Sequence, residues 1–134
     1  TREQLGGLSH TVGYVLEDRA YKSLPKLLKE DFGVEVEGGL KRDYMEVGRN
    51  RYEEINIIGK GKKDGREVLI LGEAKTQLKK SDIDSFMEKI NRLKAHLGYG
   101  EKILVFVTYQ ASPPVREYAK QKGVAVYFSY QFDL

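Results

Sequence analysis

Two short stretches of the chain carry residues that could hydrolyse a phosphodiester bond. Glu73 and Lys75 end the apolar run VLILG, and Asn56 lies in the preceding stretch INIIG, two residues after Glu54. Alternate residues of a β-strand share a face, so Glu73 should point the same way as Lys75, and Glu54 the same way as Asn56. A carboxylate beside an amide oxygen can bind a hard cation, and a nearby lysine can position water or stabilise phosphate charge. The pattern indicates phosphodiester hydrolysis.

Each of these residues also has an ordinary structural explanation. An isolated Glu-x-Lys on a strand is usually a surface ion pair, and Asn56 could simply satisfy a backbone group in the sheet. Glu73 and Lys75, however, end a run that looks buried and have polar neighbours across a hairpin. That position favours the functional interpretation.

A hairpin must bring the two stretches together. Strands are expected at about 53–59 and 67–75, and the Asp64-Gly65 pair between them is a strong hairpin signal. Before the hairpin, the spacing predicts a helix over Ser9–Lys22 that includes Glu17. Pro25 cannot continue this helix without a kink, but it could open a second helical turn that Gly33 ends. Residues 34–37 alternate like a strand, and 41–52 read as a loop or an irregular strand.

After the hairpin the pattern is helix, strand, helix, strand. A helix capped by Ser81 is followed by the buried strand 103–107, a second helix begins at Ser112, and residues 124–132 form the last strand. Its alternating apolar side chains are expected in the core: Val124, Val126, Phe128, Tyr130 and Phe132. The predicted order is αβββαβαβ, an α/β fold in which a mixed sheet is flanked by helices and the 53–75 hairpin forms the antiparallel side.

Composition limits the class of protein. The 134 residues fit one domain, the absence of cysteine excludes disulfides and thiolate zinc sites, and no apolar run is long enough to span a membrane. We therefore expect a cytoplasmic protein, and the initial Thr1 suggests a fragment of a longer chain. Residues 41–80 hold eleven Lys/Arg against seven Asp/Glu. Such an excess suits a polyanion, although a solvated basic face is the commoner explanation.

The residues and their order resemble the PD-(D/E)XK nuclease superfamily. Glu54-Ile-Asn56, a hairpin and then Gly72-Glu73-Ala74-Lys75 are similar to its signature, an acidic residue on one strand followed by (D/E)-x-K on the next. The resemblance implies a restriction-endonuclease-like αβββαβ core with an acidic residue on the first helix, where this chain has Glu17. It extends over nearly the whole chain and is greatest to archaeal, largely uncharacterised members that often carry an upstream coiled coil.

The resemblance also implies roles. Glu73 would ligate a divalent metal, usually Mg²⁺ with Mn²⁺ as a substitute, and the Ala74 carbonyl would be a further ligand. Lys75 would orient or activate the attacking water, and Glu17 would bind the metal directly or through water. Gln77 would touch the DNA substrate. Its phosphates would meet basic side chains: Arg49, Arg51, Lys62, Lys63, Lys79 and Lys80.

Asn56 departs from the family pattern, which has Asp at this position. The amide oxygen can still coordinate a cation but adds no negative charge, so metal affinity and hydrolysis should fall. Three explanations stay open: an engineered inactivation, a natural loss of activity, or a natural variant in which Glu54 or Glu53 supplies the charge. The first two together are favoured over the third, because Glu54 lies about 6–7 Å further along the strand.

Three functions are therefore considered. The first is a magnesium-dependent deoxyribonuclease, with Glu73 and Lys75 as its strongest candidates. The second is a catalytically inactive module of the same fold that binds nucleic acid or a protein. The third is a purely structural domain attached to a coiled coil. Pairing of the last strand with a second copy would give a homodimer, the minority interpretation of that segment.

Overall fold

The computed structural model describes residues 2–98 and 100–132, and within the first helix it describes side chains from Tyr14 onward. The helices and strands are α1 (Arg2–Phe32), β1 (Glu35–Gly48), β2 (Arg51–Lys63), β3 (Arg66–Gln77), α2 (Lys80–Leu93), β4 (Glu101–Gln110), α3 (Pro113–Gln121) and β5 (Val124–Phe128), with short 3-10 turns at Lys94–His96 and Ser129–Gln131. The predicted order αβββαβαβ is confirmed.

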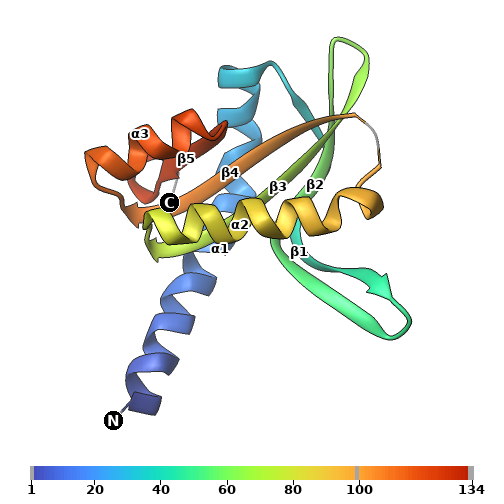
Figure 1. Ribbon diagram of the computed structural model, residues 1–134. Helices are drawn as coiled ribbons and strands as arrows, with labels where there is room; N and C mark the ends of the chain where they lie inside the picture. The colour runs from blue at the N-terminus through green and yellow to red at the C-terminus, as the bar shows by residue number, and fades with distance from the viewer. Residues whose placement is uncertain (1, 99, 133–134) are drawn as a thin grey trace.

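A five-stranded sheet separates two helical layers. Its order is β1-β2-β3-β4-β5, with β1, β2 and β3 antiparallel and β3, β4 and β5 parallel, so the predicted mixed sheet is confirmed. One face packs on α1 and the other on α2 and α3 (Figure 1). No described helix is long and apolar enough to cross a membrane.

The β2–β3 hairpin turns at the predicted residues. Asp64 and Gly65 both have positive φ, 50° and 76°, as a two-residue type I′ turn requires. The antiparallel register then runs from Lys63 opposite Arg66 to Ile57 opposite Gly72. Gly72 has a separate reason to be glycine, because a Cβ there would come within 2.5 Å of the Val105 side chain on β4. A larger residue before Glu73 would push β3 away from β4.

Segment 41–52, predicted as a loop or an irregular strand, is an irregular strand pair. The β1–β2 register passes from Lys41 opposite Ile58 to Asp43 opposite Ile55, so two steps on β1 match three on β2. This is a β-bulge in β2 around Asn56. Ile57 therefore packs in the α1 layer and Ile55 in the α2 layer, although strict alternation would put both on one face.

Two predicted details are wrong. Ser81 does not cap α2: the helix begins at Lys80, and the Lys79 backbone N–H donates to the Asp82 carboxylate at 2.9 Å. The last strand ends at Phe128 instead of continuing to 132, and the chain then makes a 3-10 turn. Tyr130, expected in the core, is consequently 80% exposed, whereas Phe132 is buried.

Candidate active site

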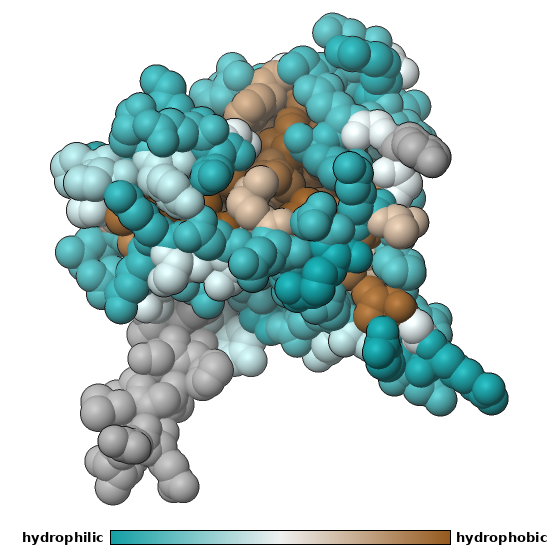
Figure 2. Space-filling view, viewed as in Figure 1, coloured by the Kyte–Doolittle hydropathy of each residue, from teal (hydrophilic) through white to brown (hydrophobic). Residues whose placement is uncertain are grey.

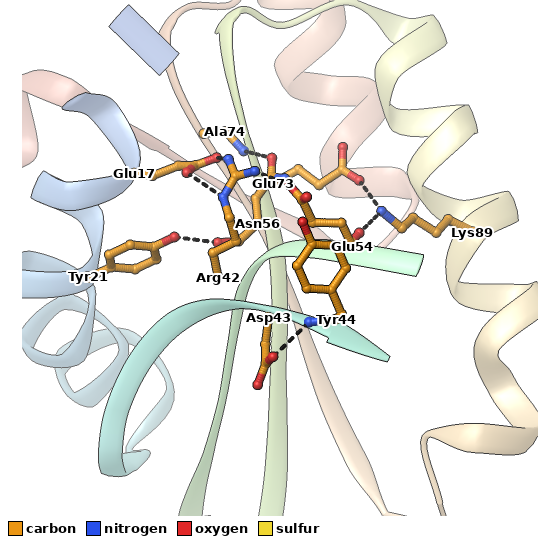
Figure 3. Close-up of polar contacts among 10 residues, drawn as sticks. All are labelled: Glu17, Tyr21, Arg42, Asp43, Tyr44, Glu54, Asn56, Glu73, Ala74 and Lys89. Carbon is orange, nitrogen blue, oxygen red and sulfur yellow. Dashed lines mark hydrogen bonds and ion pairs between the residues drawn. The ribbon is translucent and has the colours of Figure 1, made fainter. Parts of the chain in front are cut away.

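The candidate site lies where β2 and β3 stop pairing. The antiparallel ladder ends at Ile57 and Gly72, and Asn56, Glu73 and Lys75 lie just beyond it. Asn56 bridges the opening, because its Oδ1 accepts the Ala74 backbone N–H at 3.2 Å (Figure 3). Its carbonyl accepts the Tyr21 hydroxyl from α1 at 2.6 Å. Asn56 therefore holds helix α1, strand β2 and strand β3 together at the site.

Glu17 is paired with an arginine at the edge of the site. It is 4% exposed, and both of its carboxylate oxygens accept hydrogen bonds from the Arg42 guanidinium of β1. Arg42 also donates to Glu54 of β2. These three residues form the Arg42 cluster, in which the Glu17–Arg42 pair lies on the α1 side of the sheet (Figure 3). One guanidinium thus donates hydrogen bonds to two carboxylates.

The pKa values reflect this arrangement. The hydrogen bonds with Glu17 hold the pKa of Arg42 above its ordinary value, so Arg42 stays charged. Burial, with a further contribution from the Glu17 carboxylate, raises the pKa of Tyr21 to about 12. The Tyr21 hydroxyl therefore remains a donor to Asn56 throughout the physiological range.

Glu73 lies on the opposite side of Asn56 and has a different partner. Its Oε1 is 3.4 Å from the Lys89 ammonium of α2, which also donates to the Glu54 carbonyl (Figure 3). The contact is longer than the roughly 2.7–2.9 Å of a strong charge-assisted hydrogen bond. Within the described part of the chain, Oε2 has no hydrogen-bond partner. Glu73 thus keeps an oxygen available for a ligand.

Lys75 follows Glu73 at strand spacing and is half-buried. Leu71 packs in the α2 layer and Glu73 contacts α2, so alternation places Lys75 on this same side of β3. Its ammonium forms no hydrogen bond or ion pair with any residue that the structure describes. Glu73, Lys75 and Lys89 form the Glu73 cluster.

The structure does not gather Glu54, Asn56, Glu73 and Lys75 on one face as strand alternation suggested. The β2 bulge turns Glu54 toward Arg42 and aims the Asn56 amide at the β3 backbone. The structure does not support Glu54 as the replacement for the missing Asp, because the Glu54 carboxylate already pairs with Arg42.

The basic residues expected to contact phosphates fall into two groups. The first group lies at the same end of the sheet as Glu73, together with Gln77: Arg49, Arg51, Lys79 and Lys80. Lys62 and Lys63 directly precede the Asp64-Gly65 turn, roughly 20–23 Å along the hairpin from Glu73 at about 3.3 Å per residue. These two lysines pair instead with Glu37 at 3.9 Å and Glu101 at 3.7 Å.

Metal binding at this site would depend on mixed oxygen donors. Among the described residues, no group of three His, Cys, Asp or Glu side chains could hold a metal ion. The free Oε2 of Glu73, the second lone pair of Asn56 Oδ1 and the Ala74 carbonyl are nevertheless oxygen donors of the kind that Mg²⁺ prefers. The donor atoms are therefore of the type that binds a divalent cation, but they include only one charged carboxylate.

Sequence reasoning missed Arg42 and Lys89. Nothing in KRDY distinguishes Arg42, because the bulge decides its direction. Lys89 carried a signal: it lies three residues after Phe86 and four before Leu93, both fully buried, so a lysine interrupts the apolar stripe of α2. A charged group on a buried stripe implies a partner inside.

The comparisons with known proteins describe the fold. No family model and no curated protein matches the sequence. The structure is similar to the crystal structure of a protein of unknown function, AF1548, with a TM-score of 0.52 and 18% sequence identity. The match covers 84% of this chain and 58% of that one, so this chain spans less than two thirds of its neighbour. At this identity the likeness shows a shared fold.

Proposed function

We propose that the chain is a metal-dependent nuclease of the PD-(D/E)XK type that hydrolyses phosphodiester bonds in DNA. The observation that carries the proposal is the Glu73 cluster: a carboxylate with a free oxygen and a lysine without a partner in the described chain, two residues apart at the end of a buried strand. An ordinary surface Glu-x-Lys pair would satisfy itself. Here each group keeps its binding capacity.

The element order supports the same proposal. The chain from α1 to β4 has the αβββαβ order of a restriction-endonuclease-like core, and the motif residues lie on its second and third strands. The mixed sheet puts Glu73 and Lys75 at the open end of the β2–β3 pair. The proposed core therefore accounts for the position of the motif.

Glu73, the Asn56 amide oxygen and the Ala74 carbonyl would hold the cation, Mg²⁺ or Mn²⁺. A bound divalent cation supplies charge stabilisation at the scissile phosphate and lowers the pKa of water. The Lys75 ammonium donates to the attacking water and orients it, or stabilises the developing charge on the phosphate. It is available for this because it has no competing partner among the described residues. Asn56 positions Ala74 through its hydrogen bond. Glu17 acts indirectly, by fixing Arg42.

Cleavage of fluorescently labelled single- and double-stranded DNA tests this function. In Mg²⁺ or Mn²⁺ the chain should cut slowly, Asn56→Asp should cut faster, and Lys75→Ala should not cut. Asn56→Asp adds a charge yet keeps the oxygen that accepts the Ala74 N–H. If Asn56→Asp neither cuts any nucleic acid nor binds either metal, the enzyme proposal is wrong.

One observation favours a second candidate, a module that binds nucleic acid or a protein without cutting. Arg42 already pairs with two of the carboxylates near the site, and Asn56 contributes no charge. A site with one carboxylate binds metal weakly but can still accept a phosphate beside Lys75. This candidate predicts DNA binding that weakens steeply with salt, and no cleavage by the chain as it stands.

A further inference from the structure

The end of the β1–β2 hairpin projects from the sheet as an arm, residues 43–53. Figure 1 shows it reaching beyond the layer formed by α2, and Figure 2 shows a hydrophilic tip at the lower right. The arm carries two large exposed aromatic side chains, Tyr44 at 62% and Tyr52 at 58% exposure. Exposed tyrosines so close together need an explanation beyond packing.

The strand register puts both tyrosines on one face. Tyr44 is opposite Glu54 and Tyr52 is opposite Glu46, so the two rings are diagonal neighbours across the hairpin. Met45 and Val47 point to the other face and pack against the α2 layer. The arm is thus anchored through one face and presents its tyrosines on the other.

The charges around the tyrosines suit a polyanion. Arg49 and Arg51 lie at the tip, both exposed, and neither forms an ion pair with a described residue. Glu54 on the tyrosine face is already paired with Arg42, which leaves Glu46 as the opposing charge on that face. Glu54 lies two residues after Tyr52 on β2 and pairs with Arg42, so the tyrosine face leads to the Arg42 cluster, on the side of the sheet opposite Glu73 and Lys75.

We infer that this arm is a stacking platform for the unpaired bases of a single-stranded nucleic acid. Aromatic rings stack on any exposed base, whereas the bases of a duplex are stacked on one another and offer no free faces. Arg49 and Arg51 contact the phosphates of the same strand. This stacking does not depend on the proposed nuclease function.

Fluorescence anisotropy in EDTA tests the binding without cleavage. A labelled mixed-sequence 20-mer should bind as a single strand at least about tenfold more tightly than as a duplex, and Tyr44→Ala/Tyr52→Ala should weaken single-strand binding about tenfold or more. Tyr44→Phe/Tyr52→Phe should retain it. Arg49→Gln/Arg51→Gln should reduce the salt dependence, which the tyrosine changes leave intact.

Tyr130→Ala is the matched control. This tyrosine is 80% exposed and follows β5, at the other edge of the sheet from the arm, so its removal should leave binding unchanged. Single-strand binding that survives the double alanine change, or equal binding of duplex and single strand, overturns the inference. The nuclease proposal fails separately, if the arm binds single strands but Asn56→Asp cuts nothing in Mg²⁺.

Discussion

The Arg42 cluster and the Glu73 cluster lie on either side of Asn56 and use similar groups in different ways. In the first, a guanidinium donates to two carboxylates and Glu17 is 4% exposed. In the second, the Glu73–Lys89 contact is 3.4 Å, and Lys75 has no partner in the described chain. A satisfied buried network fixes structure, whereas groups with remaining hydrogen-bonding capacity can bind a ligand. The difference distinguishes a stabilising cluster from a candidate functional one.

The largest expected effect belongs to the Arg42 cluster. Arg42→Ala leaves the buried Glu17 carboxylate without its partner, which should lower the free energy of unfolding by about 3–5 kcal/mol. Urea denaturation measures this loss. Arg92→Ala is the control, because it removes the more exposed ion pair with Glu53 and should cost at most about 1 kcal/mol. Equal losses in the two variants would remove the distinction between the clusters.

Lys75→Ala should change activity and leave stability nearly unchanged, the opposite of Arg42→Ala. Under the proposed function it removes the ammonium that would position water or phosphate, so cleavage should fall about 10²–10⁴-fold. Because Lys75 forms no hydrogen bond or ion pair with a described residue, the melting temperature should hardly change. Single-turnover cleavage and thermal melting on the same sample measure both. A variant that melts much lower but retains its activity would assign Lys75 to the structure instead.

Asn56→Asp tests whether charge is what the Glu73 cluster lacks. A second carboxylate should tighten Mn²⁺ binding about tenfold or more, while the hydrogen bond from the Ala74 N–H is retained. Isothermal titration with Mn²⁺ measures the change. Asn56→Ala, which loses both the oxygen and the hydrogen bond, is the matched control and should bind more weakly than the unchanged chain. Unchanged affinity in both variants would exclude position 56 from the metal site.

The smallest effect is expected at Tyr21, which joins α1 to the Asn56 carbonyl. Tyr21→Phe should cost about 1 kcal/mol at neutral pH by removing one hydrogen bond. The pKa of Tyr21 rises from 10.0 to about 12 on folding, so its contribution is complete below pH 10 and is lost as the pH rises toward 12. Melting temperatures of the two proteins should therefore converge across that range. A constant difference between them would contradict the raised pKa.

The sequence was most informative where local rules decide the structure. Asp64-Gly65 identified the hairpin because few residues adopt positive φ, and VLILG identified a buried strand that ends in polar residues. These signals located Glu73 and Lys75. The same local rules failed for residues 129–132, where Tyr130 continues the alternation of apolar residues but lies outside the strand and is exposed.

The remainder of the site depended on long-range structure. Alternation predicted that Glu54 and Asn56 share a face, but the bulge in β2 breaks that pattern. No residue in EINIIG indicates that a bulge occurs there. Arg42 reaches Glu17 across 25 positions of the chain and could not be assigned from its neighbours. Lys89 alone could have been suspected, from its place on the buried stripe of α2.

The proposed function requires a divalent cation to bind at the Glu73 cluster and not at the Arg42 cluster. Electron paramagnetic resonance of Mn²⁺, titrated with the unchanged chain, Glu73→Gln and Glu17→Gln, tests it most directly because free and bound Mn²⁺ give different signals. Glu73→Gln should abolish binding, whereas Glu17→Gln should keep it within about threefold at a temperature where the fold is intact. Binding that survives Glu73→Gln and disappears in Glu17→Gln would contradict the account.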